Sequence, residues 1–317
     1  MPKLVSILMP VYNAELSIKK AIESCLAQTY TNIEIVVLDN GSNDKSSEIL
    51  KSIYDGRLRL LKVNENLGIA AGRNILLKEA KGEFIAWLDA DDEMRDDRIE
   101  KQVAHFSKHP ELDILGTWIY VEQTQLKKAP LNHTDISAAL WFKNCLYQPS
   151  MMSRNFYMRE NIFYDESYAN TLEDYELWYR LRNKKTFGNL DAALTHYKQT
   201  SGKDLENKKA KGNFETNLNR LWAIKWQEIQ IPIGEKDKLI FQNFLYKNAV
   251  LESIETASIL TTLNAIEKQF KDKSYNRICN FHRLRVWRNT DAYGKLKNMY
   301  LLLNIFQYPS MSKLNLR

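Results

Sequence analysis

Short apolar runs alternate with helix-like segments over the first third of the chain. Each run is five or six residues long, and in the segments between the runs apolar residues recur at helical spacing. The expected strands are 5–9, 33–38, 58–63 and 84–88, and the expected helices between them are 16–26, 45–53 and 69–80. This alternation is typical of βαβ units. The predicted fold class is therefore α/β, with a mostly parallel sheet and helices on both faces.

The pattern becomes less regular after a helix predicted over residues 98–106. The elements expected in this middle part are strands over 114–121, 148–153 and 193–199 and a helix over 171–182. Beyond residue 202 the chain is rich in Lys and Asn, and helices are expected over 213–230, 237–252, 257–270 and 293–306. The sequence therefore predicts a sheet domain over residues 1–202 and a basic helical region over residues 203–317.

The charges are distributed unevenly between these two parts. The 317-residue chain has a net charge of +6, of which residues 1–201 carry −3 and residues 202–317 carry +9. Such a basic region favours an anionic partner, for example an anionic membrane surface. A solvated helical surface explains the same charges equally well.

Cysteine usage and hydropathy indicate the compartment. Cys25, Cys145 and Cys279 lie far apart without Cys-x-x-Cys spacing, which favours a reducing environment over a disulfide or zinc scaffold. No window approaches the roughly 20 apolar residues of a membrane-spanning helix, and the first residues lack the apolar stretch of a signal peptide. We therefore expect a cytoplasmic protein.

Three polar loops follow the first, second and fourth predicted strands. They are PVYNAE (10–15), DNGSND (39–44) and DADDE (89–93). Because open α/β sheets bind ligands at the carboxyl ends of their strands, we expect the functional site at these loops. Asp39 ends the second strand, where its carboxylate can accept hydrogen bonds from a base or a ribose. Ser42 or Asp44 can at the same time cap the following helix.

The loop after the fourth strand carries Asp89, Asp91 and Asp92. Three carboxylates this close repel one another unless a cation neutralises them. Mg²⁺ and Mn²⁺ favour oxygen ligands and commonly combine one or two protein carboxylates with phosphate oxygens, so this loop can hold a diphosphate through a metal. The alternative is an acidic helix start, in which the carboxylates cap the helix and interact with its dipole.

A second acidic pair, Glu173 and Asp174, opens the helix predicted over 171–182. Adjacent helical residues point about 100° apart, so only one of the two carboxylates can face a given cleft. A carboxylate in that position can accept the proton of an acceptor hydroxyl, and the helix dipole favours its ionised form at neutral pH. The same dipole explains the pair without any catalytic role.

Taken together and in order, five segments resemble the family 2 glycosyltransferases of the GT-A fold. They are PVYN (10–13), VVLDNGSND (36–44), NLGIAAGRN (66–74), FIAWLDADDE (84–93) and LEDYELWYRL (172–181). The resemblance covers about residues 4–200. It implies an inverting, metal-dependent enzyme that transfers a sugar from a UDP-sugar to a saccharide acceptor, so that an α-linked donor gives a β-glycoside.

The resemblance also implies a role for each matching residue. Asp174 is the implied general base, with Glu173 as its catalytic neighbour. Asp91 is the implied main ligand of Mn²⁺ or Mg²⁺, and Asp89 contacts the metal and the ribose or donor sugar. In the implied donor pocket, Tyr12, Asn13 and Asp39 line the uracil and ribose, Gly41 and Ser42 shape the adjoining loop, and Arg73 reaches the base or phosphates. Pro10 is a further implied donor-binding residue.

The chain departs from the family pattern in two places. Asn40 stands where many members carry a second Asp. Members also often have a basic-His-Ser segment that meets the phosphates after the last strand. Here that segment is HYKQTSGKD (196–204), in which Lys198, Ser201 and Lys203 are all candidates for the phosphate contact.

A narrower likeness points to bacterial lipooligosaccharide β-1,3-N-acetylglucosaminyltransferases. It is carried by DADDEMRDDRIEKQ (89–102), HTDISAALWFKN (133–144) and LEDYELWYRL (172–181). It implies a UDP-GlcNAc donor and a lipid-linked acceptor at the cytoplasmic face of the inner membrane, in lipooligosaccharide, O-antigen or capsule synthesis. UDP-galactose, UDP-glucose and UDP-GalNAc are the alternative donors.

Two other classes of protein fit the sequence less well. A nucleotidyltransferase shares the sheet and the acidic metal site, but it usually has a glycine-rich, basic loop after the first strand, and PVYNAE contains neither glycine nor lysine. A nucleic-acid-binding protein would place phosphates against three acidic loops, which repel them in the absence of metal.

Overall fold

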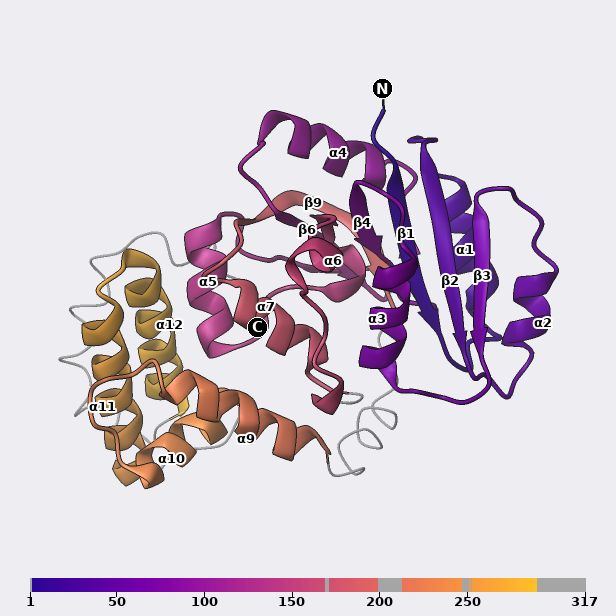
Figure 1. Cartoon of the computed structure of the whole chain (residues 1–317). Helices are drawn as coiled ribbons and strands as arrows, with labels where there is room; N and C mark the ends of the chain where they lie inside the picture. The colour runs from indigo at the N-terminus through magenta and orange to yellow at the C-terminus, as the bar shows by residue number, and fades with distance from the viewer. Residues whose placement is uncertain (1, 169–170, 199–212, 247–250, 252, 290–317) are drawn as a thin grey trace. The chain divides into compact units, whose positions relative to one another are not determined.

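The sheet carries the loops of the expected site. In a computed structural model of the chain, residues 2–168, 171–198, 213–246, 251 and 253–289 are described (Figure 1). Within them, nine strands form one sheet in the order β3-β2-β1-β4-β8-β6-β9-β5, with β7 paired to β6. The strands are β1 (Val5–Val11), β2 (Ile33–Asn40), β3 (Leu58–Val63), β4 (Phe84–Trp87), β5 (Glu93–Met94), β6 (Ile114–Val121), β7 (Gln125–Lys127), β8 (Met152–Arg154) and β9 (Phe187–Tyr197).

The first four strands are all parallel, so their carboxyl ends lie at one edge. Strand β8 runs antiparallel to β4 and β6, whereas β9 runs parallel to β6. The short strand β5 pairs antiparallel with β9 and brings the loop after β4 beside the end of β9. The α/β fold class predicted from the sequence is confirmed.

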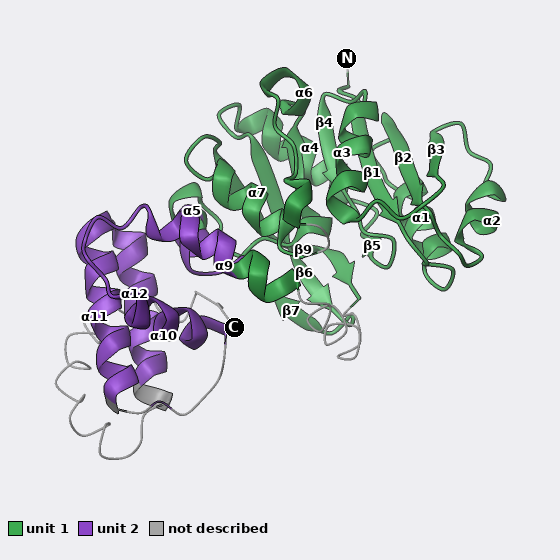
Figure 2. Ribbon diagram, turned by 60° about the horizontal axis from the view of Figure 1, so that its bottom comes forward, with its two compact units in different colours: residues 1–136, 145–218, 316 green, residues 137–144, 219–315, 317 purple. Residues whose placement is uncertain are grey.

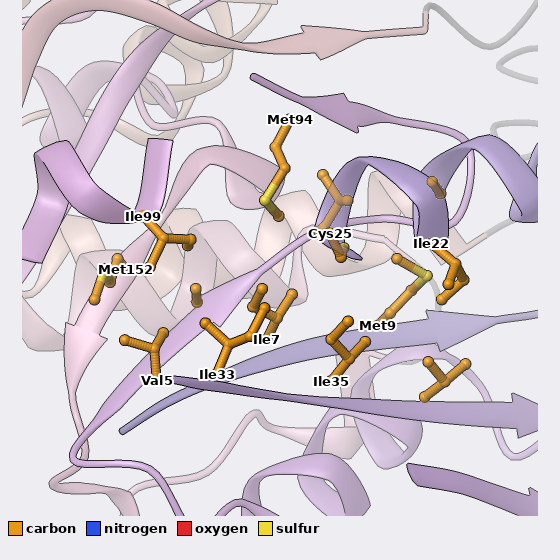
Figure 3. Packing of buried hydrophobic residues seen from close by; sticks show 14 of the residues in the cluster. Val5, Ile7, Met9, Ile22, Cys25, Ile33, Ile35, Met94, Ile99 and Met152 are labelled. Carbon is orange, nitrogen blue, oxygen red and sulfur yellow. The ribbon is translucent and has the colours of Figure 1, made fainter. Parts of the chain in front are cut away.

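One face of the sheet packs against helices α1 (Ile18–Leu26) and α4 (Arg98–Lys108) through a continuous apolar cluster (Figure 3). Side chains alternate between the faces of a strand, so every second residue of β1 and β2 enters this cluster. Its members include Val5, Ile7, Met9, Ile22, Cys25, Ile33, Ile35, Met94, Ile99 and Met152. Helix α2 (Ser46–Lys51) contributes Leu50 to the same cluster.

Helix α3 (Ile69–Glu79) packs against β1 and β2. Gly72 allows the close approach, because a Cβ atom there would lie 3.3 Å from Asn40 Nδ2 and 3.5 Å from Leu38 Cδ2. Leu38 and Asn40 alternate with the β2 residues of the apolar cluster, so α3 covers the opposite face of the sheet.

The chain divides into two compact units, coloured green and purple in Figure 2. Unit 1 comprises residues 1–136 and 145–218 together with residue 316, and unit 2 comprises 137–144 and 219–315 together with residue 317. The predicted domain boundary at residue 202 falls in segment 199–212, which lies outside the described residues. Helix α5 (His133–Phe142) and helix α9 (Asn213–Trp226) each contribute residues to both units.

Unit 2 has an aromatic core of its own. Trp141 packs edge-on against Trp222 and Trp226, with ring centroids 5.4 Å and 5.6 Å away. Its remaining helices are α10 (Glu235–Tyr246), α11 (Ser253–Phe270) and α12 (Lys273–Asn289). In the part of the chain that is described, no helix is both long enough and apolar enough to cross a bilayer.

Several elements differ from the sequence prediction. The sequence pattern does not predict helix α5. It also does not predict α6 (Tyr157–Glu160) or the strands β5 and β7, which are too short to show periodicity. The segment expected as strand 148–153 is a 3₁₀ turn (Gln148–Ser150) followed by β8. Helix α12 was not predicted, and the helix expected over 293–306 lies outside the described residues.

Candidate active site

The loops after β1 and β2 are joined by hydrogen bonds between the backbone of one and side chains of the other. Asn13 has a positive φ of 51°, its N–H donates to Ser42 Oγ at 3.1 Å, and its Oδ1 accepts from Asn43 N at 2.8 Å. Two further bonds run from Ala14 N to Ser46 Oγ at 2.8 Å and from Glu15 N to Asp44 Oδ2 at 3.0 Å. The two loops therefore form one unit.

Gly41 is required by the path of the second loop. Its φ of +75° lies in the left-handed region, and a Cβ atom would come within 2.4 Å of the backbone carbon of Glu65. The neighbouring Asn40 donates to the carbonyl of Gly68 at 3.0 Å and accepts from Leu67 N at 3.2 Å. An amide can make both bonds whereas an ionised carboxylate can only accept, which gives a physical reason for Asn at this position.

Asp39 is fully buried at the end of β2. Its Oδ1 accepts from Ser42 N at 2.9 Å, but its Oδ2 has no hydrogen-bond partner among the described residues. Lys62, its register partner on β3, holds Nζ 3.8 Å from this oxygen, and the lysine side chain is 47% exposed. The Asp39 carboxylate is therefore only partly paired within the described residues.

The side chains of Pro10 and Asp39, two of the residues predicted to line the donor pocket, point to opposite faces of the sheet. Tyr12, the first residue of the loop that follows β1, is 46% exposed. Pro10 is in register with Leu38 within the sheet, whereas Val11 is in register with Asp39. Pro10 therefore faces α3, on the opposite side of the sheet from Asp39.

The acidic loop follows β4 and turns back on itself through a bond from Asp92 N to the carbonyl of Asp89 at 3.1 Å. Asp91 is exposed, the Asp89 side chain is 26% exposed, and Asp92 is fully buried. Asp92 Oδ1 accepts from Lys198 N at 2.8 Å, and its Oδ2 lacks a partner among the described residues. Burial, with added repulsion from Asp89 and Asp91, raises the pKa of Asp92 well above its ordinary value.

This loop has suitable chemistry for Mg²⁺ or Mn²⁺. The carboxylates of Asp91, which is exposed, and Asp89, whose side chain is 26% exposed, are hard oxygen ligands, and Asp92 Oδ2 beside them has no hydrogen-bond partner among the described residues. Over the described residues, no three acidic, histidine or cysteine side chains converge on one point. Mg²⁺ commonly takes one or two protein carboxylates together with phosphate oxygens, and the carboxylates of Asp89 and Asp91 fit that donor set.

Arg73 of α3 links the acidic loop to the acidic pair. Its side chain is 5% exposed, its Nη1 donates to Glu173 Oε1 at 2.5 Å, and its Nη2 donates to Asp89 Oδ1 at 3.2 Å. The rings of Trp87 and Tyr164 lie 5.8 Å and 5.5 Å from the guanidinium carbon. Burial acts to lower the pKa of Arg73, but Asp89 and Glu173 raise it above its ordinary value.

The two acidic residues that open α7 (Glu173–Leu181) differ in burial. Leu172 precedes it with a φ of 64°, Glu173 is buried, and Asp174 is half-buried. Burial raises the pKa of Glu173 to about 7, because the repulsion from Asp174 adds to desolvation while Arg73 opposes it. At Glu173, burial therefore outweighs the stabilisation that a helix start gives to an ionised carboxylate.

Tyr197, at the end of β9, shows that the two acidic groups share one region. Its pKa is raised by burial first and then by Asp92, Asp89, Asp91 and Asp174. Because these electrostatic effects weaken with distance, the carboxylates of the loop and of α7 all lie near this tyrosine. Of the candidates for the phosphate contact, Lys198 is exposed directly after Tyr197, and Ser201 and Lys203 lie outside the described residues.

The sequence interpretation missed two amides that hold the segment leading to α7. Asn74 accepts from Tyr164 N at 2.9 Å and donates to its carbonyl at 3.0 Å. Asn217 of α9 donates to the carbonyl of Tyr168 at 2.6 Å and to that of Thr171 at 3.2 Å. Asn74 could have been suspected from its place beside Arg73 in the GRN segment, but no sequence pattern marks Asn217.

Relatives by sequence carry glycosyltransferase names. An uncharacterized glycosyltransferase of Haemophilus influenzae is 49% identical over 102 residues, which are 32% of this chain and 41% of that protein. A second protein of that description and organism is 33% identical over 211 residues, or 62% of this chain and 65% of that protein. The chain thus spans less than two thirds of the length of these two relatives. The Escherichia coli UDP-Glc:alpha-D-GlcNAc-diphosphoundecaprenol beta-1,3-glucosyltransferase WfaP is 31% identical over 211 residues, 65% of this chain and 81% of that protein.

Solved structures share the fold. The crystal structure of S. aureus TarS 1-349 in complex with UDP-GlcNAc has a TM-score of 0.57 at 17% identity, and the match covers 96% of this chain and 90% of that chain. At this level of identity the likeness concerns the fold. It agrees with a GT-A sheet followed by a helical C-terminal region.

The family follows from the sheet, its loops and the sequence match together. Residues 6–171, which are more than half of the chain, match the family model described as Glycosyl transferase family 2. This range contains β1 except for Val5, all of β2 and β4, and the three loops described above. The chain belongs to glycosyl transferase family 2.

Proposed function

We propose that this protein is an inverting glycosyltransferase that moves a sugar from a UDP-sugar to a saccharide acceptor, with Asp174 as the general base. The observation that carries this proposal is the difference in burial and contacts between the two residues of the acidic pair. Glu173 is buried against Arg73, whereas Asp174 is half-buried and shares the neighbourhood of Tyr197 with the loop 89–92. One carboxylate therefore remains accessible for proton transfer beside a loop suited to a diphosphate.

Different residues of the chain would serve different steps of an inverting displacement. The orphaned Oδ2 of Asp39 is suited to accept a hydrogen bond from the uracil N–H once Lys62 moves aside. Asp91 and Asp89 would hold Mn²⁺ or Mg²⁺, which when bound neutralises charge on the leaving diphosphate. Asp174 accepts the proton of the acceptor hydroxyl as that oxygen attacks the anomeric carbon. No second carboxylate nucleophile is needed, because a single displacement inverts the configuration.

UDP-GlcNAc is the donor that we propose to test first. The resemblance to lipooligosaccharide N-acetylglucosaminyltransferases supports it, and TarS shares the fold in its UDP-GlcNAc complex. The name of WfaP supports UDP-glucose instead and describes an acceptor sugar on a lipid diphosphate. UDP-galactose and UDP-GalNAc complete the candidates. The proposed acceptor is a saccharide, free or lipid-linked, in cell-surface glycan synthesis such as that of lipooligosaccharide, O-antigen or capsule.

A donor panel tests the proposal directly. Purified protein with Mn²⁺ would be offered each of the four UDP-sugars with saccharide acceptors, and released UDP and the anomeric configuration of the product would be measured. We expect one UDP-sugar to dominate and an α-linked donor to give a β-linked product. Retention of configuration, or no UDP release with any donor and acceptor, would contradict the proposal.

We also propose that the basic C-terminal region associates with an anionic membrane surface. The +9 charge of residues 202–317 supports this, since a basic residue near anionic headgroups contributes up to about 1 kcal/mol. Binding to anionic vesicles is expected at low salt and should weaken sharply as salt rises, because exposed charges are screened over about 8 Å at physiological ionic strength. Equal binding to neutral vesicles, or none at low salt, would favour the solvated surface.

A further inference from the structure

Arg73 has contacts that a donor-binding residue does not require. Its guanidinium donates to Asp89 on the acidic loop and to Glu173 on α7, and these partners lie 16 and 100 residues away along the chain. The Arg73 and Glu173 side chains are 5% and 9% exposed, so their ion pair is shielded from water, whereas the Asp89 side chain is 26% exposed. Both terminal nitrogens of the guanidinium thus already donate to protein carboxylates.

The surroundings of Arg73 fix its position. The aromatic rings of Trp87 and Tyr164 lie near the guanidinium, and Tyr164 is in turn held by Gln148 Nε2, which donates to its hydroxyl at 2.8 Å. The next residue on α3, Asn74, holds the backbone of Tyr164 from both its N–H and its carbonyl. Arg73 therefore contacts the two acidic elements from a rigid base.

This arrangement controls the direction of Asp174. Adjacent residues at a helix start point about 100° apart, so the inward position of Glu173 directs Asp174 away from Arg73 and leaves it half-buried. At the same time Arg73 holds Asp89, one of the carboxylates on the donor side. A single guanidinium thus sets the separation between the proposed base and the donor loop.

Arginine suits this task better than lysine. Its planar fork presents several N–H donors in fixed directions, so it can serve two carboxylates at once, whereas an ammonium group is a compact charge on a flexible stem. Misplacement of a reacting group by about 1 Å can reduce turnover by about 100-fold. The loss of one contact is therefore expected to affect catalysis more than donor binding.

We propose that Arg73 is a positioning residue that couples the donor-binding loop to the base-bearing helix, and that it does not itself bind the base or phosphates of the donor. The proposal rests on the function proposed above. It assigns to Glu173 the role of anchor for α7, so that Asp174 alone accepts the proton.

The test compares Arg73→Lys, Arg73→Met, Glu173→Gln and the double variant Arg73→Met/Glu173→Gln. Turnover at saturating substrates, the acceptor KM and the dissociation constant for UDP would be measured well below each melting temperature. We expect Arg73→Lys to lose about 10-fold and Arg73→Met about 100-fold in kcat, with UDP binding changed less than about threefold. The double variant removes the buried unpaired carboxylate, so it is expected to regain thermal stability over Arg73→Met. Its kcat should be no lower than that of the worse single variant, because the two residues act as one unit.

Three results would overturn the proposal. The first is a near-normal kcat in Arg73→Lys and also in either Arg73→Met or the double variant. The second is a kcat that recovers to the wild-type value as the double variant regains stability, which would indicate a purely structural role. The third is an unchanged kcat with UDP binding weakened at least about 10-fold, which would place Arg73 at the donor as the sequence suggested. Failure of the proposed function is recognised separately, by a wild-type protein that releases no UDP or an Asp174→Asn variant that remains active.

Discussion

The two sides of the candidate site are held together by different forces. Around the loops after β1 and β2, backbone N–H groups donate to Ser42, Ser46 and Asp44, and most of these contacts lie at the surface. Between the acidic loop and α7, the main links are the ion pairs of the buried Arg73 with Asp89 and Glu173. After their proposed roles, we call these regions the nucleotide side and the acidic side.

The difference suggests a division between binding and chemistry. Hydrogen bonds to backbone groups fix the shape of a loop, so the nucleotide side is suited to the binding of a ligand of constant form. Buried charges interact strongly and over longer distances, so the acidic side is sensitive to any change of charge. We therefore expect substitutions on the acidic side to reduce turnover and substitutions on the nucleotide side to weaken donor binding.

The largest effect is expected from Asp174→Asn on the acidic side. The amide keeps the shape of the side chain but cannot accept the proton, so turnover should fall by about 10²–10⁴-fold. UDP affinity, measured by calorimetry, and the melting temperature should stay near the wild-type values, because Asp174 is half-buried. Normal turnover in this variant, combined with an inactive Glu173→Gln, would move the base by one residue.

A somewhat smaller loss is expected from Asp91→Asn, which removes the exposed carboxylate of the acidic loop. The metal is expected to contribute several kcal/mol of charge stabilisation, so turnover should fall by about 10²–10³-fold. A chelator should abolish activity, and added Mn²⁺ should restore it. Asp96→Asn, a nearby exposed aspartate, is the matched control. Full activity in excess chelator would exclude metal dependence.

Gly41→Ala tests the nucleotide side. Its positive φ and the 2.4 Å approach to the backbone of Glu65 force the loop to move, at a cost of about 1–3 kcal/mol. We expect the dissociation constant for UDP to rise about 10-fold, while kcat at saturating donor changes little because the acidic side is intact. Gly56→Ala is the control, since a Cβ atom there meets nothing within 4 Å. A loss of kcat without weaker UDP binding would contradict the assignment of binding to the nucleotide side and turnover to the acidic side.

The sequence predicted the nucleotide side more completely than the acidic side. Strands β1–β4 and the loops between them are local features, and their alternation with helices is visible as periodicity. Glycine at residue 41 is also a local signal of a positive φ. The family resemblance supplied the candidates on both sides, but it does not show that the register of β1 and β2 sends the side chains of Pro10 and Asp39 to opposite faces.

The contacts of the acidic side depend on pairs that are distant in sequence. Neither spacing nor periodicity shows that Arg73 meets Glu173, or that Lys198 N meets Asp92, because these contacts arise only when β9 and α7 return to the sheet. The pKa of Glu173 is the clearest example. The helix start alone predicts an ionised carboxylate, but burial dominates and raises its pKa to about 7.

The smallest expected effect concerns the pH dependence of stability, and it separates the two sides without measuring activity. Folding raises the pKa of Glu173 from an ordinary value of 4.5 to about 7, so between these values the unfolded chain binds fewer protons than the folded protein. The free energy of unfolding must therefore fall as pH rises through this window, by the order of 2 kcal/mol from this group. Glu173→Gln removes this contribution, so the wild-type melting temperature should decline more steeply than that of the variant between pH 5 and 7.

Asp44→Asn on the nucleotide side is the matched control for this comparison. Burial acts to raise the pKa of Asp44, but hydrogen bonds from Ser46 and Glu15 outweigh it and lower the pKa below its ordinary value of 3.8. Its stabilising effect is complete above that value and is lost only at more acidic pH, so the Asp44→Asn curve should run parallel to the wild type between pH 5 and 7. Asp92 also has a raised pKa but is present in all three proteins, so it cancels in the comparison. Parallel curves for wild type and Glu173→Gln would show that Arg73 keeps Glu173 ionised throughout, and that the charge of the acidic side is fixed over this pH range.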